Sequence, residues 1–165
     1  MKRSKFRTLL PVVSCALIAA ASPAWAGASV KFTGADHFTD LPFASWDRTE
    51  VMQQLEAHFA KLAKSLPAGQ DLKVEVTDID LAGTIDPTRS PGRDLRILRG
   101  MADWPRINLK YTVEAGGKAV KSGEATVSDM NYLRNHNRYP NNEPLRYEKR
   151  MLDRWFSSDV LGARA

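Results

Sequence analysis

The chain has 165 residues, of which 24 are Lys or Arg, 19 are Asp or Glu and one is Cys, with a formal net charge of +5. This length is enough to bury a hydrophobic core, and a single cysteine excludes a scaffold held together by internal disulfides. The net positive charge would suggest nucleic-acid binding only if it were spread over the folded domain, and it is not.

The first 26 residues have the three-part layout of a secretory signal. An apolar run from Leu9 to Ala21 follows the basic start, and Ala24-Trp25-Ala26 places small residues where a signal peptidase reads them. The basic start consists of Lys2, Arg3, Lys5 and Arg7. The run is too short to span a membrane, which takes about 20 residues. We predict cleavage after Ala26 and a periplasmic or secreted protein. A lipoprotein processed at Cys15 is the less favoured alternative, because the apolar stretch before Cys15 is very short.

Removal of this leader changes the charge and the chemistry of the chain. Residues 27–165 contain 20 basic and 19 acidic side chains, a net charge of +1, and no cysteine. The argument for nucleic-acid binding is lost, and so are thiolate metal sites and cysteine catalysis. The remaining 139 residues fit one domain without a further membrane-spanning segment.

The first predicted elements are a short strand and an amphipathic helix. Alternation over Val30–Thr33 predicts the strand, and residues 34–42 read as a loop. Asp47 and Glu50 have capping-box spacing and predict the helix start. A stripe at helical spacing then predicts one buried face, formed by Val51, Leu55, Phe59, Leu62 and Leu66. Pro67 and Gly69 predict the helix end.

A second strand begins at Leu72 and changes phase as it runs toward Gly83. Leu72, Val74 and Val76 share one face, so Asp78 and Asp80 fall on that same face unless the register shifts. We favour a β-bulge after Thr77, because bulges commonly re-aim a strand near its end. The alternative places two carboxylates about 7 Å apart on the inner face, where they could share a cation or a guanidinium.

The middle of the chain predicts an excursion followed by a hairpin. Residues 84–92 carry two prolines and a glycine, and residues 95–98 read as a short edge strand. Residues 107–113 alternate cleanly, 115–117 predict a turn, and 119–127 return as the partner strand.

A polar loop over 129–142 and a helix over 143–156 close the chain. The expected fold is α+β: one small antiparallel or mixed β-sheet with both helices packed on one face, because strands need a second layer to bury their apolar side.

Seven side chains are candidate binding residues. Asp78 and Asp80 are joined by Arg96, Arg99, Trp104, Arg106 and Tyr132. Arginine suits carboxylate or phosphate, so these residues predict a site for a small anionic ligand or an envelope protein. We favour a structural interpretation, in which the arginines, with Arg89 and Arg93, form structural ion pairs, Trp104 anchors a strand, and Tyr132 helps to hold the closing helix.

Several stretches of the chain resemble a known family. They are 66–70 (LPAGQ), 76–83 (VTDIDLAG), 102–107 (ADWPRI), 128–132 (SDMNY), 147–152 (YEKRML) and 155–156 (WF). Together they cover nearly all of the chain after the leader, and they resemble the domain of unknown function 3016 family of small secreted bacterial proteins. The resemblance implies an exported envelope protein and no assigned reaction. It therefore brings no catalytic residues.

The sequence does not decide between three functions. We favour a non-enzymatic periplasmic binding or accessory domain, because no catalytic motif, cofactor motif or metal-ligand spacing is present; His37, His58 and His136 lie far apart. One alternative is a cation-dependent hydrolase that uses Asp78 and Asp80, so enzymatic activity stays open. The other is a structural envelope protein.

Overall fold

The computed structural model describes residues 27–86, 96–100 and 102–163. Its elements, in chain order, are β1 (Ala28–Phe32), η1 (Ala35–His37), α1 (Ser45–Ala63), β2 (Gln70–Asp80), β3 (Thr84–Ile85), β4 (Arg96–Ile97), β5 (Arg106–Ala115), β6 (Lys118–Ser128), α2 (Arg146–Trp155) and η2 (Phe156–Val160). The predicted leader, with Cys15, lies outside the described residues, as do Arg89 and Arg93.

Four strands form one mixed sheet in the order β1-β2-β5-β6. β1 runs parallel to β2 because α1 carries the chain back between them, whereas β2, β5 and β6 form an antiparallel meander. The predicted α+β class is confirmed. A second, two-stranded sheet pairs β3 with β4, and the latter falls within the predicted edge strand.

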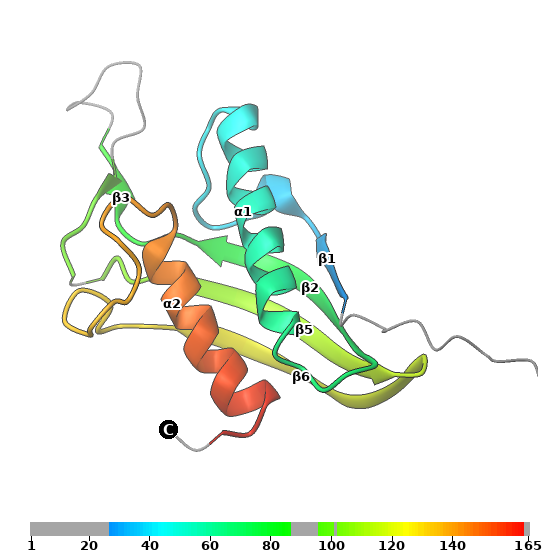
Figure 1. Cartoon of the computed structure of the whole chain (residues 1–165). Coiled ribbons are helices and arrows are strands. Elements are labelled where there is room, and N and C mark those ends of the chain that lie inside the picture. Colours follow the sequence, from blue (N-terminus) through cyan, green and yellow to red (C-terminus); the bar gives the residue numbers. More distant parts are fainter. Residues whose placement is uncertain (1–26, 87–95, 101, 164–165) are drawn as a thin grey trace, which may run out of the picture.

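Side-chain alternation places the core on one side of the sheet. Leu72, Val74 and Val76 are buried, whereas Lys73 is exposed and pairs with Glu114 at 2.8 Å. The buried strand residues belong to one cluster with residues of both helices, including Leu55, Phe59, Met151, Leu152 and Trp155. Figure 1 shows both helices lying across the same side of the sheet, consistent with this shared core.

The first helix begins two residues before the predicted cap. Its N-cap is Ala44, which makes no side-chain capping bond, so the predicted capping box is wrong. Asp47 lies in the first turn instead, where a carboxylate favours the positive end of the helix dipole. The predicted apolar stripe is confirmed for Leu55, Phe59 and Leu62, which are buried.

The closing helix begins at Arg146, not at residue 143. Leu145 precedes it in the left-handed conformation (φ 54°), and this turn sets the later start. The helix then widens into a π-turn, η2, in which the Leu161 amide donates to the Phe156 carbonyl at 2.9 Å.

Three consecutive charged residues of α2 are buried: Glu148, Lys149 and Arg150. In the described part of the chain, no helix combines the length and apolar character needed to span a membrane.

Candidate functional site

The phase change in β2 is a β-bulge at Thr77. Val76 pairs with Leu109 and Asp78 with Asn108, so Thr77 is the extra residue. Ile79 is fully buried after the bulge, and therefore Asp78 and Asp80 lie on the opposite face of the sheet. The predicted bulge is confirmed, and the alternative with two carboxylates facing the core is wrong.

Both aspartates have protein partners. Asp78 accepts hydrogen bonds from the Thr39 amide at 2.7 Å and from the Thr39 hydroxyl at 2.9 Å, one to each carboxylate oxygen. Asp80 pairs with Arg106 at 3.0 Å. Partial burial raises the pKa of Asp80, and the nearby Asp40 and Asp78 carboxylates add to this rise while Arg106 opposes it. Asp78 holds the loop before α1 against the end of β2.

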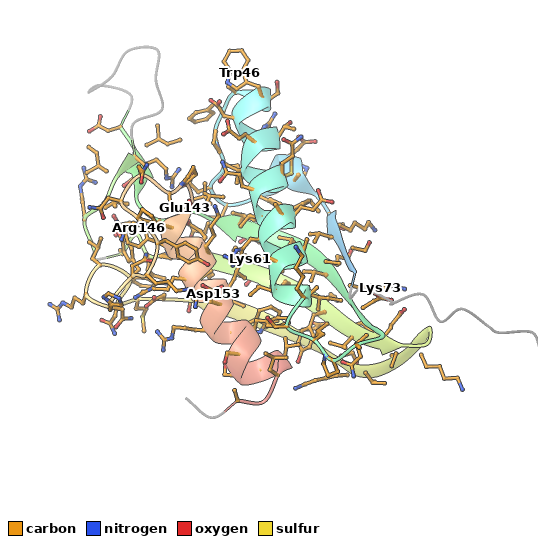
Figure 2. All side chains as sticks on the ribbon, in the orientation of Figure 1. Trp46, Lys61, Lys73, Glu143, Arg146 and Asp153 are labelled. Atoms are coloured by element: carbon orange, nitrogen blue, oxygen red, sulfur yellow. The ribbon has the colours of Figure 1, made fainter. Side chains whose placement is uncertain are left out.

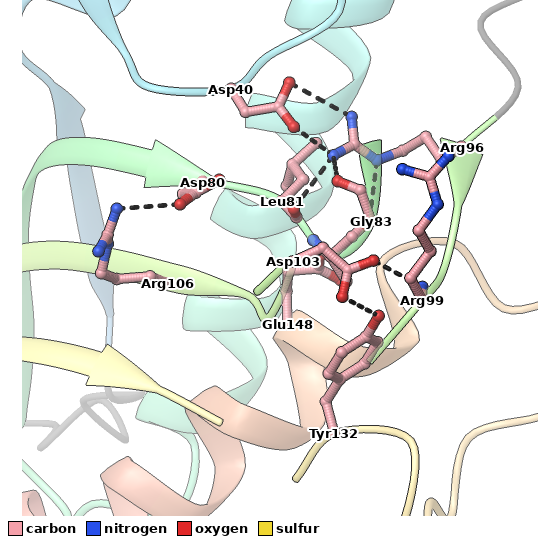
Figure 3. Close-up of polar contacts among 11 residues, drawn as sticks. Asp40, Asp80, Leu81, Gly83, Arg96, Arg99, Asp103, Arg106, Tyr132 and Glu148 are labelled. Carbon is pink, nitrogen blue, oxygen red and sulfur yellow. Dashed lines mark hydrogen bonds and ion pairs between the residues drawn. The ribbon is translucent and has the colours of Figure 1, made fainter. Parts of the chain in front are cut away.

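Arg96 organises the chain where β2 ends (Figure 3). Its guanidinium donates to the carbonyls of Leu81 at 3.0 Å, Ala82 at 2.9 Å and Gly83 at 2.7 Å, and it also pairs with Asp40. Glu148 from α2 accepts the Ala82 amide of the same turn at 2.8 Å. Burial raises the pKa of the Glu148 carboxyl. The arginine fork therefore satisfies backbone groups that would otherwise lack partners.

Asp103 joins two more of the predicted residues. Its carboxylate accepts the Tyr132 hydroxyl at 3.0 Å and the Arg99 amide at 2.6 Å. Burial, followed by the hydrogen bond to Asp103, raises the pKa of Tyr132 to about 12, so this phenol stays neutral. Arg99 contacts Asp103 through its backbone amide, and its side chain is exposed. Trp104 is half-buried.

The structure thus gathers the predicted residues around the end of β2 and the start of β5, and Figure 3 shows Asp80, Arg96, Arg99, Arg106 and Tyr132 among them. Asp78, Asp80, Arg96 and Arg106 bind neighbouring protein groups with their side chains. This arrangement stabilises the loops at that end of the sheet.

A different surface has the form of a binding groove, and the sequence did not indicate it. A groove of ≈ 570 Å³ lies between β6 and α2–η2. One wall is the continuous run Glu124–Asp129; the other contains Met151, Arg154, Trp155, Ser157, Ser158 and Asp159. Because successive strand residues point to opposite faces, a wall of consecutive residues is the hydrogen-bonding edge of β6.

Two contacts mark the ends of this groove, which we call the β6 groove. At one end the Lys121 ammonium donates to the Val160 carbonyl at 3.0 Å. At the other end Asp129 forms a buried ion pair with Arg150. β6 is the last strand of the sheet. Between these contacts, five residues of the strand line the groove, Glu124–Ser128.

The indole of Trp155 lines the groove. The ring packs edge-on against Tyr111, with 5.3 Å between ring centroids, and against Phe156 at 6.2 Å. Trp155 is 94% buried, and its Nε1 has no hydrogen-bond acceptor among the described residues. An unsatisfied buried donor of this kind costs about 1–3 kcal/mol.

An exposed aromatic pair lies elsewhere on the surface. Phe43 and Trp46 are 84% and 75% exposed at the N-terminal end of α1, and Figure 2 shows Trp46 projecting away from the molecule. This pair is far from the β6 groove in the fold, because α1 packs beside β1, which is at the opposite edge of the sheet from β6.

The chain matches the model of a family described as "Protein of unknown function (DUF3016)" over residues 26–158. The match covers most of the chain, and the protein belongs to this family, which confirms the resemblance drawn from its motifs. No curated protein matches the chain significantly, and neither does any solved structure.

Proposed function

We propose that the protein is an exported, non-enzymatic binding domain of the bacterial envelope that accepts an extended segment of a partner protein along β6. The observation that carries this proposal is the groove between the free edge of β6 and α2–η2. A groove of ≈ 570 Å³ falls within the size range of pockets that bind small ligands and peptide side chains.

The edge of β6 supplies the main-chain recognition. An edge strand has a row of backbone N–H and C=O groups without strand partners, and an extended peptide can pair with them. Natural edges are often protected by lysines, and Lys118 and Lys121 lie in the first half of β6. The second half is made of small or β-branched residues, Ala125–Ser128, which leave room for an added strand.

The opposite wall of the groove supplies a place for a side chain. Met151 and Trp155 line it, and burying one apolar side chain of the partner there contributes about 1.5–3 kcal/mol. Walls on both sides of the groove favour a single extended segment over a second copy of the whole domain.

The geometry of Asp78 and Asp80 does not support the hydrolase alternative. The two oxygens of Asp78 accept hydrogen bonds from Thr39, and Asp80 pairs with Arg106. These contacts are those of groups that hold loops in place. We therefore assign the two aspartates to the fold and the β6 groove to binding.

Peptide selection tests this proposal. The full-length chain is expressed, the exported protein is purified, and random ten-residue peptides are selected on it. Ser157 lines the groove and is exposed, so Ser157→Trp should fill the groove and weaken the selected peptides at least tenfold. Ser29→Trp, on the exposed face of the opposite edge strand, is the matched control and should leave Kd unchanged.

Hydrogen exchange and sedimentation complete the test. A bound peptide should slow amide exchange within residues 124–128 and leave the β1 edge unaffected. The proposal is wrong if selection enriches no peptide, or if Ser157→Trp binds as tightly as the natural protein. It is also wrong if the protein is a dimer that Ser157→Trp dissociates, because the occupant is then a second copy.

Export is tested separately. We expect N-terminal sequencing of the protein from the periplasm to begin at Gly27, and Cys15→Ser to leave its fractionation unchanged. Sequencing that begins at Met1, or a mature form that starts at lipid-modified Cys15, would contradict cleavage after Ala26.

A further inference from the structure

A second cavity lies beside α2 and shares the lining residue Arg154 with the β6 groove. Its volume is ≈ 390 Å³, and it is lined by Asn135, His136, Arg138, Arg150, Asp153 and Arg154. Three of these six residues are arginines. The proposed function does not use this cavity.

A buried ion pair builds one wall of the cavity. Arg150 pairs with Asp129 and donates to the His136 carbonyl at 3.0 Å, and the side chains of Arg150 and Asp129 are 6% and 5% exposed. Asp129 also accepts the Asn135 side-chain amide at 3.0 Å. These bonds hold the loop that carries His136 and Arg138 against α2.

The charges around the cavity leave one cation without a counterion. Arg138 pairs with Asp153 at 2.7 Å, and Asp153 also accepts the Tyr139 hydroxyl at 2.8 Å and lies 3.2 Å from the His58 Nε2. Arg150 is neutralised by Asp129. Arg154 is exposed, and its guanidinium has no partner in the part of the chain that the structure describes. A single negative charge therefore complements the cavity.

Arg154 connects the cavity to the groove, because it lines both. Asp129 is the last residue of the β6 wall and binds Arg150 in the cavity wall. If an extended segment runs along β6 and continues past Ser128, the end of that segment would therefore lie in the cavity.

We infer that this cavity binds the C-terminal carboxylate of the segment in the β6 groove, which places that segment parallel to β6. The inference rests on the proposed function and narrows its partner to proteins with an extended C-terminal tail. Arginine suits the task because its planar fork can donate two hydrogen bonds to one carboxylate. Capture of a chain-terminal carboxylate is a general way to recognise the end of a peptide.

The test compares each selected peptide with a free C-terminus and with a C-terminal amide. We expect amidation to weaken binding to the natural protein at least tenfold. In Arg154→Gln the free-acid and amide peptides should bind with nearly equal Kd. Arg134→Gln, an exposed arginine on the same loop region but outside the cavity, is the matched control and should keep the tenfold difference.

The outcomes separate this inference from the proposed function. If peptides bind in the groove but amidation has no effect, the inference is overturned and the proposed function stands. If the amidation effect survives in both Arg154→Gln and Arg138→Gln, the carboxylate is bound elsewhere and the inference is also overturned. An amidated peptide can carry an internal Glu. If such a peptide binds as tightly as the free acid through that Glu, the cavity does not recognise a C-terminal carboxylate and the inference is overturned. If no peptide binds at all, both proposals fail.

Discussion

Removing the charge of Asp129 should destabilise the protein far more than the loss of an ordinary surface ion pair. Asp129 and Arg150 have side chains that are 5% and 6% exposed, and they pair across the junction of β6 and α2. Asp129→Asn keeps the shape of the side chain but leaves the Arg150 cation buried without its counterion. Breaking a buried pair in this way typically costs about 3–5 kcal/mol.

This cost is a large share of the stability of a small domain, which is about 5–15 kcal/mol in total. For a chain of this size we expect the melting temperature to fall by roughly 10–20 °C. Urea unfolding followed by circular dichroism measures the free energy of unfolding directly. The double variant Asp129→Leu/Arg150→Met removes both charges and should recover most of the loss, because no isolated ion is left buried.

The reasoning is refuted if Asp129→Asn lowers the free energy of unfolding by less than about 1 kcal/mol, the value typical of exposed pairs. It is also refuted if the double variant is as unstable as the single one. In that case the hydrogen bonds of Asp129 to Asn131 and Asn135, and not its charge, would be the main contribution.

Three further predictions concern other residues at the same end of the sheet. Deletion of Thr77 removes the extra residue of the bulge and leaves Val76, Asp78 and Ile79 paired in the same register with Ile79 still inward, so circular dichroism should show a folded chain; an unfolded deletion variant would contradict the register. Arg96→Lys should lower the free energy of unfolding in urea by about 1–3 kcal/mol, because an ammonium cannot make the hydrogen bonds that the guanidinium donates to three backbone carbonyls. An unchanged urea midpoint would show that these hydrogen bonds are dispensable. Tyr132 should ionise near pH 12 in an ultraviolet titration. Because folding raises its pKa from 10.0, the free energy of unfolding should decrease as the pH rises from about 10 to about 12. Tyr132→Phe should not show this decrease.

Local patterns predicted the elements that depend on near neighbours in the chain. The stripe from Leu55 to Leu62 indicated α1, because its period matches a helix whatever covers it. The change of phase between Val76 and Ile79 indicated the bulge, because only a shifted register keeps both residues in the core. The predicted helix boundaries were less accurate. The starts of α1 and α2 depend on the backbone conformations of Ala44 and Leu145, which no sequence motif predicts.

The partners of the charged residues could not be predicted in the same way. Asp78 binds Thr39, 39 residues earlier, and Arg96 binds Asp40, 56 residues earlier. Alternation shows which face of a strand is buried but not which strand is its neighbour. The sequence therefore favoured structural ion pairs for these charged residues but left a ligand site open.

The sequence by itself determined the nearly neutral and thiol-free composition of residues 27–165 and indicated the α+β class and the bulge, because each depends on composition or on spacing along the chain, and the secretory signal over residues 1–26 stays a prediction. Only the tertiary structure decided that β6 is an edge strand, that α2 and η2 lie beside it, and that Arg154 stands between the groove and the arginine-lined cavity. The physical reason is that a groove is made by the space between elements. Such a space depends on strand order and on contacts between distant residues, such as Asp129 with Arg150. Neither can be predicted from patterns of neighbouring residues.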